Sequence, residues 1–319
     1  MTTTAERLTE FERRELIETA ADVARSRIAP HAEALDAADE AAIDACWEEV
    51  RALGLDRALA GDDEQPPLPA ADVLAMIEEL AVADAGFALL VLLHAVAAAA
   101  AAGAVPDGGR ATVLLAPGGD ERAFGFAPGA VGAAAFVLAA PDGARVAAPA
   151  APPHPVPDQM GLRAARAGVV ALGDGEGEPA AAIPVRALVL DGLAAIAAGI
   201  ARRAWALASA YAADRRQGGV PIAEHGAVRA LLAEIALARD AGAPALDAGA
   251  SEAAALARKL RAADAALAAA TAAVQVFGGS GYMCETGAER LMRDAMCLRL
   301  WPQPPWAARA RLVEEASGR

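Results

Sequence analysis

Aromatic side chains are scarce in this sequence. They account for 4% of its 319 residues, although hydrophobic residues together account for 56%. Alanine supplies most of that difference. It is the strongest helix former, and each alanine buries little area. The composition therefore argues against a β protein with an aromatic core and favours closely packed helices.

Cysteine and histidine are also few. The three cysteines, Cys46, Cys284 and Cys297, form no CxxC pair, and the four histidines show no metal-ligand spacing. These absences disfavour a zinc site and a disulfide framework. We therefore expect no metal, and the sparse cysteine fits a reducing cytoplasm.

Positive charge is in deficit, and no apolar run reaches the length of a membrane span. The net charge of −14 repels phosphate backbones and anionic lipid surfaces, so we expect neither nucleic-acid nor membrane binding. The most apolar run, 87–102, is shorter than the ~20 residues that a span needs. It contains His94, which we interpret by default as a satisfied histidine in a buried helix and otherwise as a residue lining an acyl pocket.

Helical patterns surround a short β-like stretch. Thr9 and Glu12 form a capping-box pattern at the start of the first helix, and β-type runs occur at 111–116, 133–140 and 167–172. Apolar spacing and stop signals predict helices at about 7–29, 40–53, 72–84, 87–102, 188–214, 221–241, 250–277, 286–294 and 305–316.

This order of elements predicts a mainly α protein in three parts. We expect an N-terminal helical domain over 1–108, a reduced β middle domain over 109–185, and a C-terminal antiparallel bundle of long helices over 186–319. The long alanine-rich helices bury little area each, so we expect the bundle to associate with another subunit as a homo- or hetero-oligomer.

One segment carries a specific motif. The string VQVFGGSGYMCETGAERLMRDA at 274–295 resembles the signature of the acyl-CoA dehydrogenase superfamily. The stretch ADRRQGGVPIAEHG upstream and MGLRAA at 160–165 are similar to other parts of that family. The resemblance implies the family's fold, with FAD as cofactor and an acyl-CoA or acyl-carrier-protein thioester as substrate.

The resemblance also implies a set of flavin contacts. In the family, the matching positions contact the pyrophosphate and adenosine end of an FAD that a neighbouring subunit mainly holds. A guanidinium suits phosphate oxygens, and glycines allow close backbone approach. The positions are Arg215, Gln275, Gly278 and Gly279. We interpret Arg293 and Asp294 in the same segment as a structural ion pair.

The chain departs from the family where chemistry is done. Pro302 occupies the usual position of the glutamate base and cannot take a proton. At the alternative base position stands Val189, and Asp191 is turned by about 200° from it on a helix. The remaining candidates for a base are weak: Asp191, Glu285 and His94. The stretch 111–160 lacks the family's motifs for holding the flavin ring.

Three hypotheses follow from this pattern. The first is a degenerate subunit that completes a flavin site in a hetero-oligomeric acyl-thioester dehydrogenase. The second is an active FAD-dependent dehydrogenase of acyl-CoA or acyl-carrier protein with a relocated base. The third is a non-redox binding or scaffold protein on the same fold.

Overall fold

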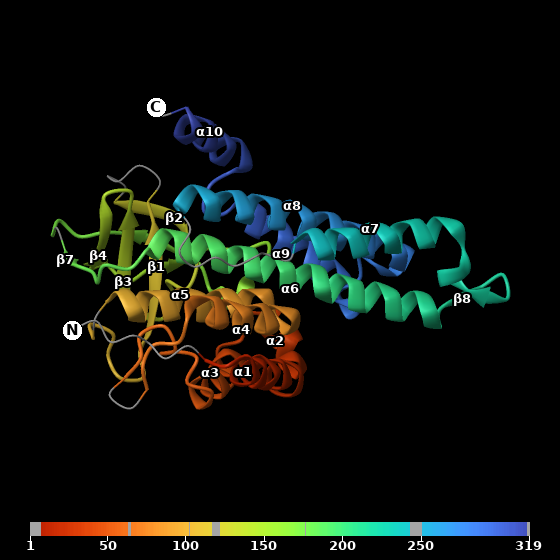
Figure 1. Ribbon diagram of the computed structural model, residues 1–319, viewed down its shortest axis with the longest axis horizontal. Helices are drawn as coiled ribbons and strands as arrows, with labels where there is room; N and C mark the ends of the chain where they lie inside the picture. Colours follow the sequence, from red (N-terminus) through yellow and green to blue (C-terminus); the bar gives the residue numbers. More distant parts are fainter. Residues whose placement is uncertain are drawn as a thin grey trace.

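The computed structural model describes residues 8–62, 65–101, 103–116, 122–175, 177–242 and 251–317. Mainly α architecture is confirmed, with the elements in the predicted order (Figure 1). Two small sheets lie at one end of the long axis, and the C-terminal helices extend from them toward the other end. The domain boundaries near 108 and 185 stay predictions.

The N-terminal helices begin at local capping residues. Thr9 and Glu12 form the predicted capping box at α1 (Glu10–Val23). After Val23 the chain continues through a π turn and a 3-10 turn into α2 (Ala32–Asp36). Asp39 and Asp84 cap α3 (Glu40–Ala52) and α5 (Ala85–Ala100) by accepting backbone N–H groups. Between them lies α4 (Ala70–Ala83).

The β segment forms two sheets. The first has the order β1-β3-β4-β7, with β1 parallel to β3 and the other neighbours antiparallel. The second is antiparallel in the order β2-β6-β5. The strands are β1 (Arg110–Leu115), β2 (Ala123–Ala127), β3 (Ala133–Ala140), β4 (Gly143–Ala147), β5 (His154–Pro155), β6 (Gly168–Ala171) and β7 (Glu178–Pro179).

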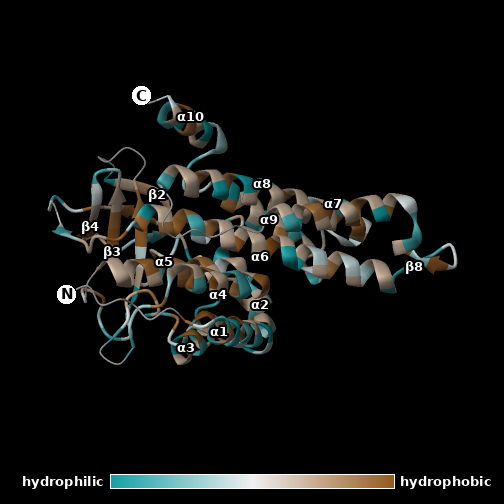
Figure 2. Ribbon diagram, in the orientation of Figure 1, coloured by the Kyte–Doolittle hydropathy of each residue, from teal (hydrophilic) through white to brown (hydrophobic). Residues whose placement is uncertain are grey.

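Strand alternation divides the core in two. Val113 and Leu115 of β1 face the large helical core, whereas Leu114 faces a small core that also contains Phe136 of the same sheet and Val170 of the opposite sheet. Colouring by hydropathy shows the same separation of buried and exposed elements: the buried strand β3 is brown, whereas α1 carries hydrophilic residues (Figure 2). The first sheet is therefore covered on both faces.

The C-terminal region contains the longest helices. They are α6 (Val185–Asp214), α7 (Gly226–Gly242), α8 (Glu252–Phe277), α9 (Ala288–Leu300) and α10 (Pro305–Ala316), with the short hairpin β8 (Arg216–Gln217) and β9 (Val220–Pro221) after α6. By length and composition α8 passes as a membrane span. However, 56% of its most apolar window is buried inside the structure, as in a core helix.

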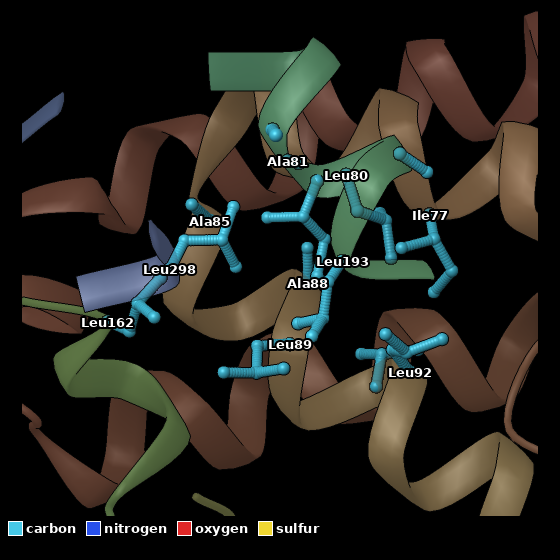
Figure 3. Packing of buried hydrophobic residues seen from close by; sticks show 14 of the residues in the cluster. Ile77, Leu80, Ala81, Ala85, Ala88, Leu89, Leu92, Leu162, Leu193 and Leu298 are labelled. Carbon is cyan, nitrogen blue, oxygen red and sulfur yellow. The ribbon is translucent and has the colours of Figure 1, made fainter. Parts of the chain in front are cut away.

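The burial of α6 changes along its length. Every residue over 187–201 is buried, but beyond that stretch only Ala204, Ala208 and Ala212 are buried. The fully buried part packs on α4 and α5, and Ala81, Leu92 and Leu193 belong to the same buried cluster (Figure 3). The later part contacts other helices along one stripe of alanines.

Candidate functional site

A cleft of about 590 Å³ opens beside the first sheet. Its walls come from β1, β2, the segment 156–160 and the C-terminal end of α9. The lining is mostly apolar and includes Phe124, Phe126 and Trp301. Its size and apolar walls are typical of small-molecule sites.

Pro302, the position of the usual base, lines this cleft. It follows α9, whose last turn is closed by the bond from the Trp301 N–H to the Cys297 carbonyl. Lys259 donates from Nζ to the Arg299 carbonyl at 3.1 Å, and burial lowers the pKa of this lysine to about 8. The turn at Pro302 is thus held in place, but Pro302 itself offers no group that transfers a proton.

A small chamber lies on the other side of Pro302. Pro302 and Leu115 line both the cleft and this chamber, whose remaining walls include Leu190, Arg186 and Glu252. Arg186 pairs with Glu252 at 2.8 Å and donates to two backbone carbonyls. The guanidinium of Arg186 and the carboxylate of Glu252 therefore bond within the protein rather than to a ligand.

Asp191 is engaged in a buried ion pair. Its two carboxylate oxygens accept from Nε and Nη2 of Arg258 at 2.7 and 2.9 Å, and its side chain is 3% exposed. A bidentate guanidinium occupies both oxygens of the carboxylate. The geometry explains why an acid is buried here, and it leaves no oxygen directed at the cleft.

His94 has two backbone partners. Its Nδ1 accepts from the Ala111 N–H at 3.0 Å, the backbone of Asp56 also bonds to the ring, and Trp47 packs edge-on at 4.9 Å. Burial, aided by the nearby Arg110 charge, lowers the pKa of His94 to about 4. A neutral ring that joins α5 to β1 fits the satisfied core histidine of our default interpretation. Glu285 lies on the surface in a short 3-10 turn.

The four predicted flavin contacts lie together at the opposite end of the bundle. Arg215 directly follows α6, and Gly278 directly follows α8. Stacking of Tyr211 on Phe277 at 4.2 Å brings these two helix ends side by side. All four residues, Arg215, Gln275, Gly278 and Gly279, are exposed.

This end is far from the cleft. Arg186, near the start of α6, shares the chamber with Pro302, whereas Arg215 follows the other end of that helix. The 30 residues of α6 span about 45 Å at 1.5 Å per residue. Figure 1 shows the sheets at one end and β8 at the other. The four residues therefore face away from the cleft of their own chain.

The described walls of the cleft do not fit an FAD. Asp158 is their only charged residue, and a carboxylate repels a pyrophosphate. Both polar atoms of Gln159, the one amide side chain among these walls, are already hydrogen-bonded. Nε2 donates to the Gly161 and Leu162 carbonyls, and Oε1 accepts from the Ala167 N–H. No described wall residue carries a hydroxyl or cationic side chain for the ring or the phosphates. Only the pyrophosphate and adenosine end of FAD has a chemistry that matches the four exposed residues around Arg215.

The ion pair that we predicted between Arg293 and Asp294 is wrong. Adjacent residues on a helix point in different directions. Arg293 instead pairs with Asp36 and Glu289, and Asp294 accepts from the Leu162 N–H at 2.6 Å. Sequence reasoning missed this junction between α9 and the N-terminal helices, because its partners are far apart in the chain.

Within the described ranges, no group of three or more histidine, cysteine or acidic residues is placed to hold a metal ion.

Comparison with known proteins identifies two family segments. Residues 10–104 match the model of the acyl-CoA dehydrogenase N-terminal domain, and residues 192–302 match that of the acyl-CoA dehydrogenase C-terminal domain. Pro302 is thus the last matched residue of the second segment.

Individual relatives agree with these models. The chain is 34% identical over 163 residues to the probable acyl-CoA dehydrogenase YngJ of Bacillus subtilis, a match that spans 45% of this chain and 43% of the relative. It is 41% identical over 117 residues to the cyclohex-1-ene-1-carbonyl-CoA dehydrogenase of Geobacter metallireducens, spanning 34% and 31%. These matches cover less than half of each relative.

A solved structure supports the fold over nearly the whole chain. Glutaryl-CoA dehydrogenase from Mycobacterium smegmatis superposes with a TM-score of 0.78 at 19% identity, covering 98% of this chain and 96% of that one. At this identity the likeness concerns the fold alone.

Proposed function

Because the chain belongs to the acyl-CoA dehydrogenase superfamily, we propose that it is a degenerate subunit of a hetero-oligomeric acyl-thioester dehydrogenase. In this role it completes a flavin site that a partner subunit mainly provides. The observation that carries the proposal is the separation of the exposed set around Arg215 from the cleft that ends at Pro302.

The missing base supports this role. Removal of a proton next to a thioester carbonyl needs a base within contact distance of that carbon. Pro302 lines the cleft where the base is expected, Asp191 is bound by Arg258, and Glu285 lies on the surface. The chain is therefore a poor candidate for catalysing the reaction alone.

The exposed set can still serve a neighbour. When bound in a complete partner site, FAD would supply the hydride-accepting chemistry. The guanidinium of Arg215 would pair with its phosphate oxygens, and the turn at Gly278 and Gly279 would let backbone approach it. No side chain or backbone atom meets a Cβ built on either glycine, so this surface is open to a ligand from outside.

The test compares the isolated chain with the chain co-expressed with a neighbouring dehydrogenase. We expect flavin absorbance only in the complex, and we expect Arg215→Ala to lower FAD occupancy there. Arg229→Ala changes another exposed arginine of the same bundle and should leave occupancy unchanged.

Two outcomes would overturn the proposal. Stoichiometric FAD on the isolated chain, with turnover of an acyl thioester, would establish an active enzyme with a relocated base. Absence of flavin in both preparations would establish a non-redox binding protein.

A further inference from the structure

We propose that the segment 158–166 is a pH-dependent element, which undocks from α9 and α5 when a proton shared by Asp84 and Asp294 is lost. This goes beyond the flavin role proposed above and does not depend on it. The inference rests on close backbone packing, strained backbone and two buried acids, which all occur at one junction.

The segment packs backbone against backbone on two helices. A Cβ built on Gly161 would lie 2.6 Å from the Arg293 carbonyl oxygen of α9. On the other side, a Cβ built on Gly86 of α5 would lie 2.8 Å from the carbonyl carbon of Leu162. Such tight contacts do not deform gradually. The segment is therefore either docked or released, with few intermediate positions.

The backbone of the segment is strained. Among the described residues, four that are not glycine have a positive φ, and three of them lie here: Asp158, Leu162 and Arg166, at 49°, 54° and 43°. A side chain such as leucine or arginine makes this conformation sterically unfavourable. Because release would relieve that strain, the docked state depends on the contacts that hold it.

Two buried acids lie close together at this junction. Asp294 of α9 accepts from the Leu162 N–H at 2.6 Å, and Asp84 accepts from the Phe87 N–H at 2.8 Å at the start of α5. They are 3% and 5% exposed. Burial raises the pKa of both acids, and the charge of Asp84 raises that of Asp294 further. Two carboxyl groups in one buried site favour holding one proton between them.

The neighbouring charges are mostly engaged elsewhere. On α9, Arg293 pairs with Glu289 at 2.5 Å and with Asp36 of α2 at 2.7 Å. Arg163, in the segment itself, also directs its guanidinium to Asp36, at 3.6 Å. The charge of Asp36 adds to the rise in pKa that burial causes in both buried acids. These groups therefore oppose a second ionisation rather than support it.

One arginine faces the buried pair. Arg290 of α9 lies 3.9 Å from the Asp84 carboxylate, and its charge acts on both acids. Arg203 of α6 lies near Arg290. Burial raises the pKa of the nearby thiols, Cys46 of α3 and Cys297 of α9, so both stay neutral near pH 7. One cation can neutralise one carboxylate, and Asp84 is the closer.

Ionisation of Asp294 therefore favours release. A second buried carboxylate without a cation costs more than a stronger bond from the Leu162 N–H gains. Water can solvate that charge once the strained segment leaves α9. Because residues 158–160 form part of the cleft wall, release also loosens that wall.

The direction of the pH dependence follows from the protons bound. In the docked state burial, with the charge of Asp84, raises the pKa of Asp294 to about 7. Once solvated, the acid returns to its ordinary value of about 3.9. The docked state thus binds more protons between about pH 4 and 7. The equilibrium constant for release should rise by up to about tenfold per pH unit in that window and level off above it.

The test is hydrogen exchange of the purified full chain at pH 5 and pH 7, corrected for the intrinsic rate at each pH. We expect the protection of amides over 158–166 to fall by about tenfold or more from pH 5 to 7. These amides should also exchange faster than those over 187–201, which are buried in α6. Equal protection of the two ranges would show that the segment opens only when the whole protein unfolds, and would overturn the proposal.

Two variants isolate the acid. Asp294→Asn keeps an acceptor for Leu162 and cannot ionise, so the segment should be equally protected at both pH values. Asp158→Asn changes an exposed acid of the same segment and should keep the wild-type fall in protection. A wild-type segment with the same protection at pH 5 and 7, or a full fall in Asp294→Asn, would overturn the proposal. The wild-type comparison needs no variant to fold.

Discussion

Asp294 is an acid buried beside other acids. Burial, together with the charge of Asp84, raises its pKa to about 7, although the bond from the Leu162 N–H opposes the shift. The unfolded value is about 3.9. The folded state therefore holds more protons between about pH 4 and 7, and this residue makes the protein less stable as pH rises through that window.

Asp294→Asn should remove this dependence while it keeps an acceptor for Leu162. The stability of the variant relative to wild type should increase from about pH 4 to 7, with a slope that approaches the limit of ~1.4 kcal/mol per pH unit for one proton. Urea unfolding across this range measures it. Asp22→Asn, at an exposed acid, is the control, and parallel curves for Asp294→Asn and wild type would contradict the prediction.

His94 tests whether a buried histidine is structural. His94→Leu leaves the Ala111 N–H without its acceptor, so we expect a loss of about 1–3 kcal/mol in the free energy of unfolding. Chemical denaturation measures this loss. His154→Leu, at an exposed histidine, should cost little. A His94→Leu variant as stable as the wild type would contradict this structural role.

At the scale of single residues, some side-chain contacts could be predicted from the sequence and others could not. The Thr9 capping box is confirmed, because its partners are three positions apart. The partner of Asp191 could not be predicted, since Arg258 lies 67 residues away and nothing local marks the pair. The fully buried Lys259 was missed for the same reason.

Among the elements, α6 packs closely on its neighbours at two glycines. A Cβ built on Gly199 would lie 2.6 Å from the Ala81 Cβ and 2.7 Å from the Glu78 carbonyl oxygen. Gly192 would meet Leu92 at 2.3 Å. Because Gly199 faces a backbone carbonyl, the packing of α6 on α4 requires the absence of a side chain there, whereas the flexible end of Leu92 could move to admit a Cβ at Gly192.

Gly199→Ala should destabilise the protein although alanine is the better helix former. The gain of ~1 kcal/mol in propensity is outweighed by overpacking against a backbone carbonyl, so we expect a net loss of about 1–2 kcal/mol. Thermal and urea unfolding measure it. Ser209→Ala on the same helix should be neutral or stabilising, and a more stable Gly199→Ala variant would show that α4 and α6 separate at little cost.

Most helices and the main strands were predictable from local patterns. Apolar spacing gave α3 and α8 within about two residues. The extent of α9 was underestimated, since the predicted helix ended near 294 and the observed one runs to Leu300. The π turn after Val23 has no sequence signal that we recognise. The cleft could not be predicted, since it joins β2 to the end of α9 across the fold.

For the whole molecule, exposed apolar side chains on the bundle support association through this region. Leu237 and Tyr282 are each 71% exposed, and Met283 is 45% exposed. We expect a dimer or larger assembly in sedimentation at micromolar concentration, and we expect Tyr282→Arg to shift it toward monomer. Phe11→Arg on α1, at a residue 70% exposed, should not. A monomeric wild type would contradict this prediction.

The change of burial along α6 gives one helix two local stabilities. Amides over 187–201 sit in the core and should exchange their hydrogens only when the whole protein unfolds, whereas those beyond Ala204 can open locally. A subunit that covers the bundle should slow exchange in the second part and leave the first unchanged. Deuterium uptake along this single helix would therefore register assembly, with its own N-terminal half as the internal standard.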